Sequence, residues 1–462
     1  MKGHRLFYVL AWIVAGLIFL GPFGYSKLFP KPTHYASEVD HFKYGSVGVE
    51  AASGVPYEVW RTLPGICMPT AQRAAGYHAF GFQWDPGKAT PIGMPLETAV
   101  VPRVGVNCAL CHVGRVETAA GPRQLVGAPN TSLDLQSYLR FLFRCASSPA
   151  FNADTILAEN DRLGGHLNPV QKLFYRAVII PQVKSVLALQ QRQLSFMDGQ
   201  PDWGPGRASG FQPAKVQVLG RPYDGTLDIV DIPPLWDTRL REGGGLHWDG
   251  ANTSIHEVFL NSGIGNGASA GSINRPNLQR METWVRDLPS APYPFPVDSG
   301  LAQAGHAVFA DNCAMCHAPG GAKLGQVTPI AWLGTDRNRL DAFTVETRDA
   351  FLGTRGYAWR YTHFRKTGGY VAAPLDGIWA RAPYLHNGSV PNLAALLSAP
   401  DQRPLTFHRG VQAYDPDAVG FVSDRGYLYD TRLPGNAATG HAWGTDLSAA
   451  DKRALLEYLK TL

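Results

Sequence analysis

The sequence predicts a mainly α protein of two domains, with long loops and few short strands, after an N-terminal transmembrane helix. Three observations support this fold class. An uncharged, strongly apolar segment follows the basic N-terminus; the pattern C-x-x-C-H occurs once in each half of the chain; and helical segments alternate with stretches rich in Gly and Pro. With 50 Gly, 35 Pro and only 17% charged residues among 462, the chain is typical of a compact protein with many loops.

The N-terminal segment has the length of a membrane-spanning helix. Its core, LFYVLAWIVAGLIFLGPF, starts at Leu6 and has 18 residues, about the minimum that spans a bilayer. Lys2 and Arg5 lie on the side expected to face the cytoplasm. A cleavable signal peptide would have a shorter apolar region before an A-x-A cut site, which is absent here. We expect residues 1–30 to anchor the protein on the periplasmic side of the inner membrane, with secretion after cleavage as the alternative.

The two pentads, NCALCH and NCAMCH, predict covalent attachment of haem. They comprise Cys108, Cys111 and His112, and Cys313, Cys316 and His317. Each thiol adds to one vinyl group of the porphyrin, and the adjacent His becomes a ligand of the iron. A thioredoxin-like redox pair would not need the His, and a zinc site would need two more soft ligands nearby. The sequence therefore predicts two haem c groups, with His112 and His317 as iron ligands.

Two further cysteines, Cys67 and Cys145, lie outside the pentads. In an oxidising compartment they could form a disulfide, and otherwise they would be two buried free thiols. The sequence does not show whether they approach each other, so both alternatives stay open.

Along the chain, periodicity and composition predict the following elements. Residues 31–105 are rich in Gly, Pro and aromatic residues and are expected to be loops around a cofactor. Helical spacing of apolar residues follows at 133–144 and at 170–194. A loop is expected at 199–213, and short strand-like pieces near 216–219. The Pro-rich stretch 288–300 marks the domain boundary, so that the two haem domains span 31–290 and 291–462.

The second domain has the helices of a small cytochrome c. One helix carries Gly305 and Phe309 and leads into the second pentad, and the chain ends in LSAADKRALLEYLKTL. Ser448 and Asp451 are a plausible N-cap and its capping-box partner for this last helix. We expect the first and last helices of the domain to cross, with Gly305 allowing the close approach.

The order of four motifs resembles that of the bacterial di-haem cytochrome c peroxidases, the superfamily that includes MauG and the di-haem rubber oxygenases. The motifs are NCALCH, LHWDGANTS (246–254), NCAMCH and APYLHNGSVPNL (382–393). The likeness is strongest to the rubber-oxygenase branch, through GIWARAPYLHNGSVPNLAALL and the late GNAATGHAWGT. The resemblance extends from about residue 60 to the C-terminus. It implies a reactive first haem and an electron-transferring second haem. A calcium ion between the domains is common in the superfamily, but its ligands are not identified here.

Trp248 matches the tryptophan that lies between the two haems in this superfamily. The resemblance implies that its indole relays electrons, with His247 and Asp249 as supporting neighbours. The alternative is a large aromatic residue of the core, which is how most tryptophans behave.

The resemblance also guides the second ligand of haem 2. The peroxidases have a Met, and MauG a Tyr, fourteen residues after the His that corresponds to His386, but the matching residue here is Pro400, which cannot bind iron. His441 matches the distal His of the rubber-oxygenase branch and is the first candidate. His386 is the second candidate, and a hydrogen bond near the haem edge, supported by Tyr384 and Asn387, is its other expected role.

Around haem 1 the sequence departs from the peroxidases. Their catalytic distal His corresponds to Ala128, and the only nearby acid, Glu117, lies too close to the pentad to replace it. A peroxidase needs a base that moves a proton between the peroxide oxygens. The missing His favours chemistry with dioxygen in an apolar pocket, or else a divergent peroxidase that uses another base. Candidate pocket residues, which could equally belong to the core, are Phe259, Leu260 and Ile264.

We therefore expect a di-haem oxidoreductase. Its expected partners are an electron donor such as a small redox protein, dioxygen or peroxide, an apolar substrate, and the membrane through the N-terminal helix. The alternative is an electron carrier without catalytic activity, in which both irons have two protein ligands; haem 1 would then be closed by Met68, Met94, His78 or His247. A net charge of +5 without a Lys/Arg run speaks against a nucleic-acid partner.

Overall fold

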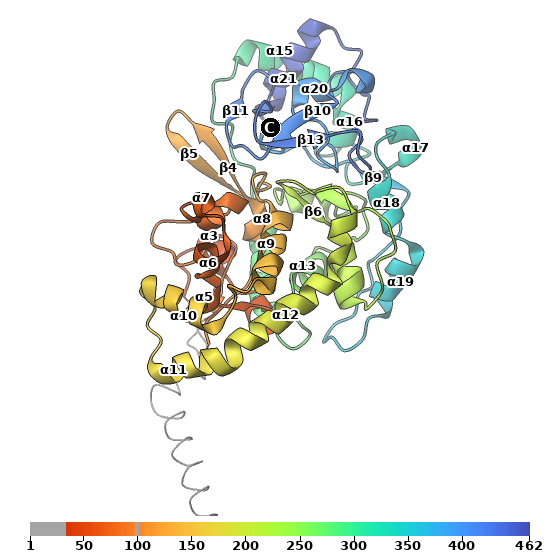
Figure 1. Cartoon of the computed structure of the whole chain (residues 1–462). Helices are drawn as coiled ribbons and strands as arrows, with labels where there is room; N and C mark the ends of the chain where they lie inside the picture. Colours follow the sequence, from red (N-terminus) through yellow and green to blue (C-terminus); the bar gives the residue numbers. More distant parts are fainter. Residues whose placement is uncertain (1–33, 98–100) are drawn as a thin grey trace, which may run out of the picture.

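A computed structural model describes residues 34–97 and 101–462 of the chain. The fold is mixed, with 42% helix and 11% strand, so the expectation of a mainly α fold is wrong. Figure 1 shows the blue C-terminal elements at one end of the molecule, and the orange and yellow elements of the first half at the other. Few short strands were expected, but their positions could not be located, because they are short pieces between loops and lack an extended alternation of polar and apolar residues.

The N-terminal transmembrane helix of the expected fold class requires a correction. Among the described helices, none has the length and apolar character needed to cross a membrane. The segment expected to be the anchor, within residues 1–30, lies outside the described part. The localisation that depended on this helix, on the periplasmic side of the inner membrane, is corrected with it.

The first half begins with short helices, although residues 31–105 were expected to be loops. They are α3 (Glu38–Tyr44), α4 (Val49–Ala52), α5 (Tyr57–Trp60), α6 (Leu63–Cys67), α7 (Thr70–Arg73), the 3₁₀ turn η1 (Gly76–Phe80) and α8 (Ala109–His112). Most of these helices span only one or two turns, too short for a visible helical period in the sequence.

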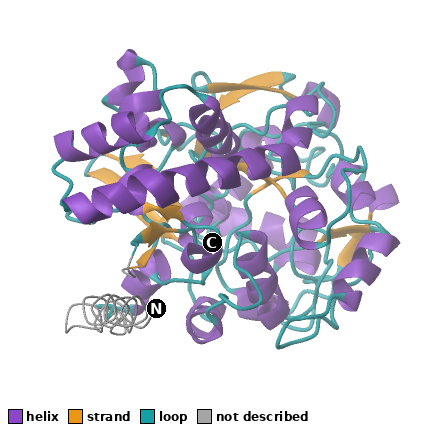
Figure 2. Ribbon diagram, turned by 60° about the horizontal axis from the view of Figure 1, so that its bottom comes forward, coloured by secondary structure: helices purple, strands orange, loops and turns teal. Residues whose placement is uncertain are grey.

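Longer helices follow. They are α9 (Leu135–Ser147), α10 (Ala153–Arg162), α11 (Pro169–Phe174), the π-helical turn η2 (Tyr175–Ile179), α12 (Ile180–Gln193), the 3₁₀ turn η3 (Ser195–Gly199), α13 (Ile255–Gly265) and α14 (Arg275–Arg286). The helices predicted at 133–144 and 170–194 are thereby confirmed. The strand-like piece expected near 216–219 is wrong: residues Ala214–Val218 form a π-helical turn, η4. Figure 2 shows the helices distributed around short strands rather than around a central sheet.

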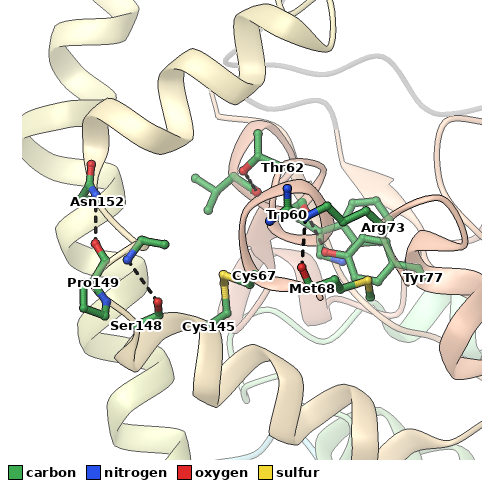
Figure 3. Close-up of a disulfide and its surroundings, with 12 residues drawn as sticks. Trp60, Thr62, Cys67, Met68, Arg73, Tyr77, Cys145, Ser148, Pro149 and Asn152 are labelled. Carbon is green, nitrogen blue, oxygen red and sulfur yellow. Dashed lines mark hydrogen bonds between the residues drawn. A yellow bond between two sulfur atoms is a disulfide. The ribbon is translucent and has the colours of Figure 1, made fainter. Parts of the chain in front are cut away.

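A disulfide joins Cys67 at the end of α6 to Cys145 in α9, with the Cα atoms 5.4 Å apart. Figure 3 shows the bond beside Met68 and the aromatic residues Trp60 and Tyr77. The two rings stack with their centres 4.2 Å apart. Of the two alternatives left open by the sequence, the structure contains the disulfide.

The strands form small separate sheets. The first sheet contains β1 (Val55–Pro56), β3 (Arg103–Val104) and β2 (Leu96–Glu97) in that order. The antiparallel pairs are β4 (Val113–Thr118) with β5 (Gly121–Val126), β6 (Arg207–Ser209) with β7 (Ile229–Asp231), β8 (Val327–Pro329) with β9 (Gly369–Val371), β10 (Thr406–Arg409) with β13 (Tyr427–Asp430), and β11 (Tyr414–Asp415) with β12 (Gly420–Phe421). β6 lies within the loop expected at 199–213.

The helices and 3₁₀ turns η5–η7 of the remaining chain are η5 (Thr238–Arg241), α15 (Ser299–Asn312), α16 (Ala314–His317), α17 (Ile330–Leu333), α18 (Asn338–Ala342), α19 (Val345–Gly353), η6 (Ile378–Ala380), α20 (Leu393–Leu396), η7 (Pro400–Gln402) and α21 (Ala449–Leu459). The predicted crossing of the first and last helices is confirmed, because α15 and α21 pack together. A Cβ atom on Gly305 would lie 1.9 Å from the carbonyl oxygen of Ala454. Ser448 caps α21 by accepting a hydrogen bond from the Asp451 amide.

The core of the second half also takes residues from the first half. Val116 and Leu125 of the β4–β5 hairpin are buried in one cluster with Trp379 and Leu455. The hairpin follows the first pentad directly and therefore connects the two pentad regions by packing. The domain boundary at 288–300 stays a prediction.

Candidate functional site

Both pentads form one short helical turn, α8 in the first half and α16 in the second. Their four cysteines form no disulfide, whereas Cys67 and Cys145 are bonded to each other. Burial raises the pKa of the Cys108 and Cys313 thiols to about 11. Two thiols with two residues between them, followed directly by a histidine, are the groups that thioether attachment of haem requires.

The imidazole of His317 is oriented by the backbone. Its Nδ1 forms a hydrogen bond of 2.7 Å with the carbonyl oxygen of Ala373, which leaves Nε2 as the free nitrogen. Burial lowers the pKa of His317, so that the neutral form is favoured. A neutral His whose second nitrogen binds a carbonyl is the usual arrangement of a metal ligand.

His441 faces His317 at a distance that fits an iron atom between them. The ring centres are 6.3 Å apart. Two imidazoles bound to opposite sides of one metal, at about 2 Å each, have ring centres separated by roughly 6 Å. Burial lowers the pKa of His441 to about 4, which favours the neutral form. The residues present therefore fit a haem with two histidine ligands.

The loop that carries His441 is held by two buried side chains. The guanidinium of Arg403 donates to the carbonyl oxygens of Ala438, Gly440 and His441, at 2.7–3.0 Å. The amide of Asn387 donates to the carbonyl oxygen of Ala437 in the same loop. His441 itself has a φ of 48°, a left-handed backbone conformation that a non-glycine residue adopts only where its surroundings impose it.

His112 has a similar neighbour in the first half. The carbonyl of Pro233 faces its imidazole and acts to raise the pKa, although Nδ1 forms no hydrogen bond of normal geometry. Burial has the larger effect and lowers the pKa of His112 to about 4.

Two loops near the candidate site, 246–252 and 384–390, have the same backbone conformation. The loop from Leu246 to Asn252 closes with an antiparallel bridge between these residues, and the loop from Tyr384 to Val390 closes in the same way. In each loop the second and the fifth residue have positive φ: His247 and Gly250 in the first, Leu385 and Gly388 in the second. By this correspondence Trp248 occupies the position of His386. The equivalence gives each pentad a scaffold of the same type.

Trp248 lies where the two scaffolds cross. The amide of Val371 donates to its carbonyl oxygen at 2.8 Å, and the amide of Asp231 donates to the carbonyl oxygen of His386 at 2.9 Å. The indole Nε1 of Trp248 donates to the carbonyl oxygen of Asp231 at 2.9 Å. Trp248 thus contacts Asp231, two residues before Pro233, and Val371, two residues before Ala373. A chain of covalent and hydrogen bonds therefore leads from the neighbourhood of His112 through Trp248 to His317.

Two arginines near the crossing have no carboxylate partner. Arg241 and Arg381 occupy equivalent positions in the two scaffolds and form no ion pair within residues 34–97 and 101–462. Arg241 donates to the carbonyls of Gly245 and His247, and Arg381 to those of Pro374 and Asp376. Burial lowers the pKa of both to about 10, and the charge of Arg381 acts on His317. Cations in this position fit the propionate groups of haem.

His386 is engaged by Tyr370. It is buried, its ring stacks on Tyr370 with the centres 4.0 Å apart, and Nε2 is 3.0 Å from the Tyr370 hydroxyl. Tyr384 and Asn387, which were expected to support His386, donate hydrogen bonds to other groups. The Tyr384 hydroxyl donates to the carbonyl oxygen of Ile378, and Asn387 donates to the His441 loop.

Near the first pentad, Ala128 is buried and Glu117 forms a half-exposed ion pair with Arg115. The residues expected to line an apolar pocket, Phe259, Leu260 and Ile264 of α13, are buried in one core cluster with Phe42 and Met281. Asp249 forms a buried ion pair of 3.1 Å with Arg339.

The four residues suggested for closing haem 1 differ in their surroundings. Met68 is buried beside the disulfide, and His78 is exposed with Nδ1 bonded to the carbonyl of Phe82. Met94 is buried beside the pentad helix, where the preceding Gly93 lies against Leu110. Burial lowers the pKa of His247 to about 4. The choice among these four residues stays a prediction.

The residues beside the candidate ligands could not be predicted from the sequence: Ala373, Pro233, Arg241, Arg381 and Arg403. Carbonyl groups carry no signal in the sequence. The duplication does have a recognisable order of elements, because a short strand, a turn with a positive φ and an Arg precede each loop. The turn residue is Asp237 before the first loop and Gly377 before the second.

Comparison with known proteins assigns part of the second half. Residues 369–408 match a family model described as RoxA-like, cytochrome c-like. This segment contains the carbonyl of Ala373 together with Arg381, His386 and Arg403. A cytochrome c-like domain implies covalently bound haem c and a haem-containing redox protein. The likeness to MauG and to the di-haem peroxidases stays a prediction.

Two relatives from Sinorhizobium fredii (strain NBRC 101917 / NGR234) are both named as uncharacterized proteins. The chain is 34% identical to y4iM over 284 residues, half of this chain and 64% of y4iM, and thus spans less than two thirds of that relative. It is 27% identical to y4iJ over 487 aligned positions, which cover 82% of this chain and 80% of y4iJ.

Proposed function

Starting from a chain with a RoxA-like cytochrome c segment at residues 369–408, we propose a di-haem c-type redox enzyme. Haem 1 would be attached at Cys108 and Cys111, with His112 as its ligand, and haem 2 at Cys313 and Cys316, with His317 and His441. The bound haems supply redox-active iron, the first to activate dioxygen or peroxide and the second to transfer electrons. We prefer an oxygenase acting on an apolar substrate to a cytochrome c peroxidase.

The pair of His317 and His441 carries this proposal. The ring centres of His317 and His441 lie 6.3 Å apart, and Arg403 holds the loop that carries His441. A haem bound between the two rings would have no free face for an exogenous ligand. A haem with two protein ligands transfers electrons, while an open haem can react. We therefore assign the reaction to haem 1, the haem expected at His112. Near that pentad, Ala128 offers no group that could move a proton between peroxide oxygens.

The role of this chain's residues follows from their contacts. Ala373 holds a proton of the His317 imidazole at Nδ1 and so leaves Nε2 to bind the iron when haem is present. Arg241 and Arg381 would neutralise the propionates. Trp248 would shorten the path between the two haems, since its indole and its carbonyl are bonded to the segments that lead to His112 and His317.

The decisive measurement is electron paramagnetic resonance of the oxidised holoprotein, after the haem content has been determined as the pyridine haemochrome. We expect two haem c per chain, one high-spin or oxygen-bound and one low-spin. Two low-spin haems that bind neither cyanide nor carbon monoxide would contradict an enzyme. They would support the second candidate, an electron carrier in which a second protein ligand, such as the half-buried His247 or the buried Met94, closes haem 1.

The preference for an oxygenase has a separate test. The holoprotein is incubated with polyisoprene or an unsaturated lipid under dioxygen, and in parallel with peroxide and a reduced small cytochrome. Turnover in the second assay alone would reject the oxygenase and leave the peroxidase.

The ligand assignment predicts that His441→Ala adds a high-spin signal at haem 2, because one face of the iron loses its imidazole. Exposed His166 provides the matched control, and His166→Ala should leave the spectrum unchanged. If His441→Ala left haem 2 low-spin while His386→Ala converted it, His386 would be the ligand.

A further inference from the structure

The helical segment from Pro169 to Gln193 has apolar side chains on two faces. One face is buried and belongs to the core of the first half, with Tyr175, Ile180, Val183 and Leu187. The other face is exposed and consists of Val170, Leu173, Phe174, Val178, Val186 and Leu189, whose exposed fractions range from 40% to 77%. We call these six residues the apolar face.

The apolar face is continuous because of the π-helical turn η2 between α11 and α12. A π-helical turn rotates the chain less per residue than an α-helical turn does. The side chains after η2 therefore stay on the same side as those before it. Figure 1 shows α11 and α12 as one yellow helical segment along the edge of the molecule, away from the elements that carry the pentads.

The charged residues of this helical segment are all positive. The 25 residues from Pro169 to Gln193 contain Lys172, Arg176, Lys184 and Arg192 but no Asp or Glu. Lys172 and Arg176 form exposed ion pairs with α10, through Asp161 and Asp154. Such pairs contribute little, so an external anion competes with them easily. Lys184 and Arg192 have no ion-pair partner within the described part of the chain.

These observations favour a lipid surface over a protein partner. An amphipathic helix with Phe, Leu and Val on one side and Lys and Arg beside them lies in the plane of an anionic membrane surface. A stable protein interface needs about 20–30 residues on each side. One convex helix edge with six apolar side chains falls short of that number.

We propose that the apolar face of α11 and α12 is a docking surface for an anionic lipid bilayer, in which its six side chains enter the interface between headgroups and acyl chains. Docking on a bilayer is independent of the haem chemistry. Contact with the bilayer would bring an apolar, lipid-soluble compound close to the protein without any contribution of the pentads.

A fluorophore placed on the helix tests this docking locally. Phe174→Cys and Val345→Cys are labelled separately with an environment-sensitive dye in the full-length holoprotein; both side chains are 44% exposed, and Val345 begins α19 elsewhere on the molecule. Labelled wild-type protein reports background. Vesicles of phosphatidylcholine with phosphatidylglycerol should shift the emission at position 174 to the blue, and brominated acyl chains should quench it, while position 345 stays unchanged. Vesicles of phosphatidylcholine alone should produce a weaker response.

Two more substitutions on the labelled Phe174→Cys protein separate the apolar contribution. Leu173→Gln with Val178→Gln should raise the lipid concentration for the half-maximal signal at least about tenfold. Because both residues are exposed, the thermal unfolding curve should not change. Equal responses at positions 174 and 345, or none at 174, would overturn the proposal. A blue shift at 174 without vesicles that grows with protein concentration would instead assign the face to a second copy of this chain.

Discussion

At the scale of single residues, Arg403 shows how one buried side chain can position another. Its guanidinium donates to three carbonyl oxygens of one loop, including that of His441, and its Nε has no hydrogen-bond partner among the described residues. These hydrogen bonds fix the backbone of the loop, so His441 keeps its left-handed conformation opposite His317. The position of His441, the proposed ligand, is thus set by a side chain that bonds the backbone of its loop.

Glu50 is a buried carboxyl group outside the candidate site. Its side chain is inaccessible to solvent, Oε2 accepts a hydrogen bond from Ser46, and Oε1 has no partner. Burial raises the pKa of Glu50 to about 7. The folded protein therefore keeps this group protonated at a pH where the unfolded chain, with its ordinary pKa near 4.5, has released the proton.

This shift predicts a pH-dependent gain in stability for Glu50→Gln. A raised carboxyl pKa means that the stabilisation is complete below about pH 4.5 and is lost as the pH rises through about 7. The neutral amide avoids this loss, so the free energy of unfolding of the variant should exceed that of the wild type by up to about 3 kcal/mol at pH 8. Chemical unfolding at pH 5 and pH 8 measures the difference.

The control for this prediction is Glu117→Gln, which removes a half-exposed carboxylate. Its stability relative to the wild type should depend little on pH. A Glu50→Gln variant with the same advantage at pH 5 and pH 8 would show that the carboxyl group is not the source.

At the scale of elements, the crossing of α15 and α21 depends on Gly305. Since a Cβ atom there would lie 1.9 Å from the Ala454 carbonyl oxygen, Gly305→Ala must separate the helices. Overpacking of this kind lowers the free energy of unfolding by about 1–3 kcal/mol. Urea unfolding followed by circular dichroism should show it. Gly353→Ala, at the end of α19 with open space around the new methyl group, should leave stability nearly unchanged.

The disulfide between α6 and α9 closes a loop with a sequence separation of 78. In the chain-entropy description, a loop of this length contributes about 4 kcal/mol by restricting the unfolded chain. Cys67→Ser with Cys145→Ser should therefore lower the denaturation midpoint. Wild-type protein unfolded in the presence of a thiol reductant should approach the variant.

The double variant itself is the control, because reductant should not change its midpoint further. If reductant destabilised the wild type and the variant equally, the effect would arise elsewhere. The thioether bonds expected at the pentads are not thiol-reducible.

Most longer elements could be predicted from the sequence. Helical periodicity located α9 and α11–α12, and the cytochrome c pattern located α15 and α21. The small strands and η4 could not be found in this way, because two to six residues show no full period, and packing against neighbouring loops decides their conformation.

At the scale of the whole molecule, two copies of one scaffold meet at Trp248. The residue belongs to the first copy, yet its carbonyl is bonded to Val371 of the second. This crossing places an indole, which can carry charge, at the junction of the segments that contact His112 and His317.

Trp248→Phe should slow electron transfer between the two haems at least about tenfold, equivalent to a barrier about 1.4 kcal/mol higher. The benzyl ring loses the hydrogen bond to Asp231 and is harder to oxidise. Rapid mixing of the oxidised holoprotein with a reductant, followed at wavelengths that distinguish the two haems, measures this rate.

Haem content and the spin state of each haem should stay as in the wild type, which excludes a simple folding defect. Trp284→Phe in α14 is the matched control. An unchanged rate in Trp248→Phe would make Trp248 a structural residue of the crossing rather than a relay.

The sequence by itself determined the local chemistry of this protein. The spacing of two thiols and a histidine defines each pentad because these groups act over a few neighbouring residues, and helix caps and periods are local for the same reason. Only the tertiary structure decided which groups face them. The meeting of His441 with His317, the Cys67–Cys145 bond and the crossing at Trp248 all join residues far apart in the chain. Their approach depends on packing and on carbonyl directions, which no local pattern encodes.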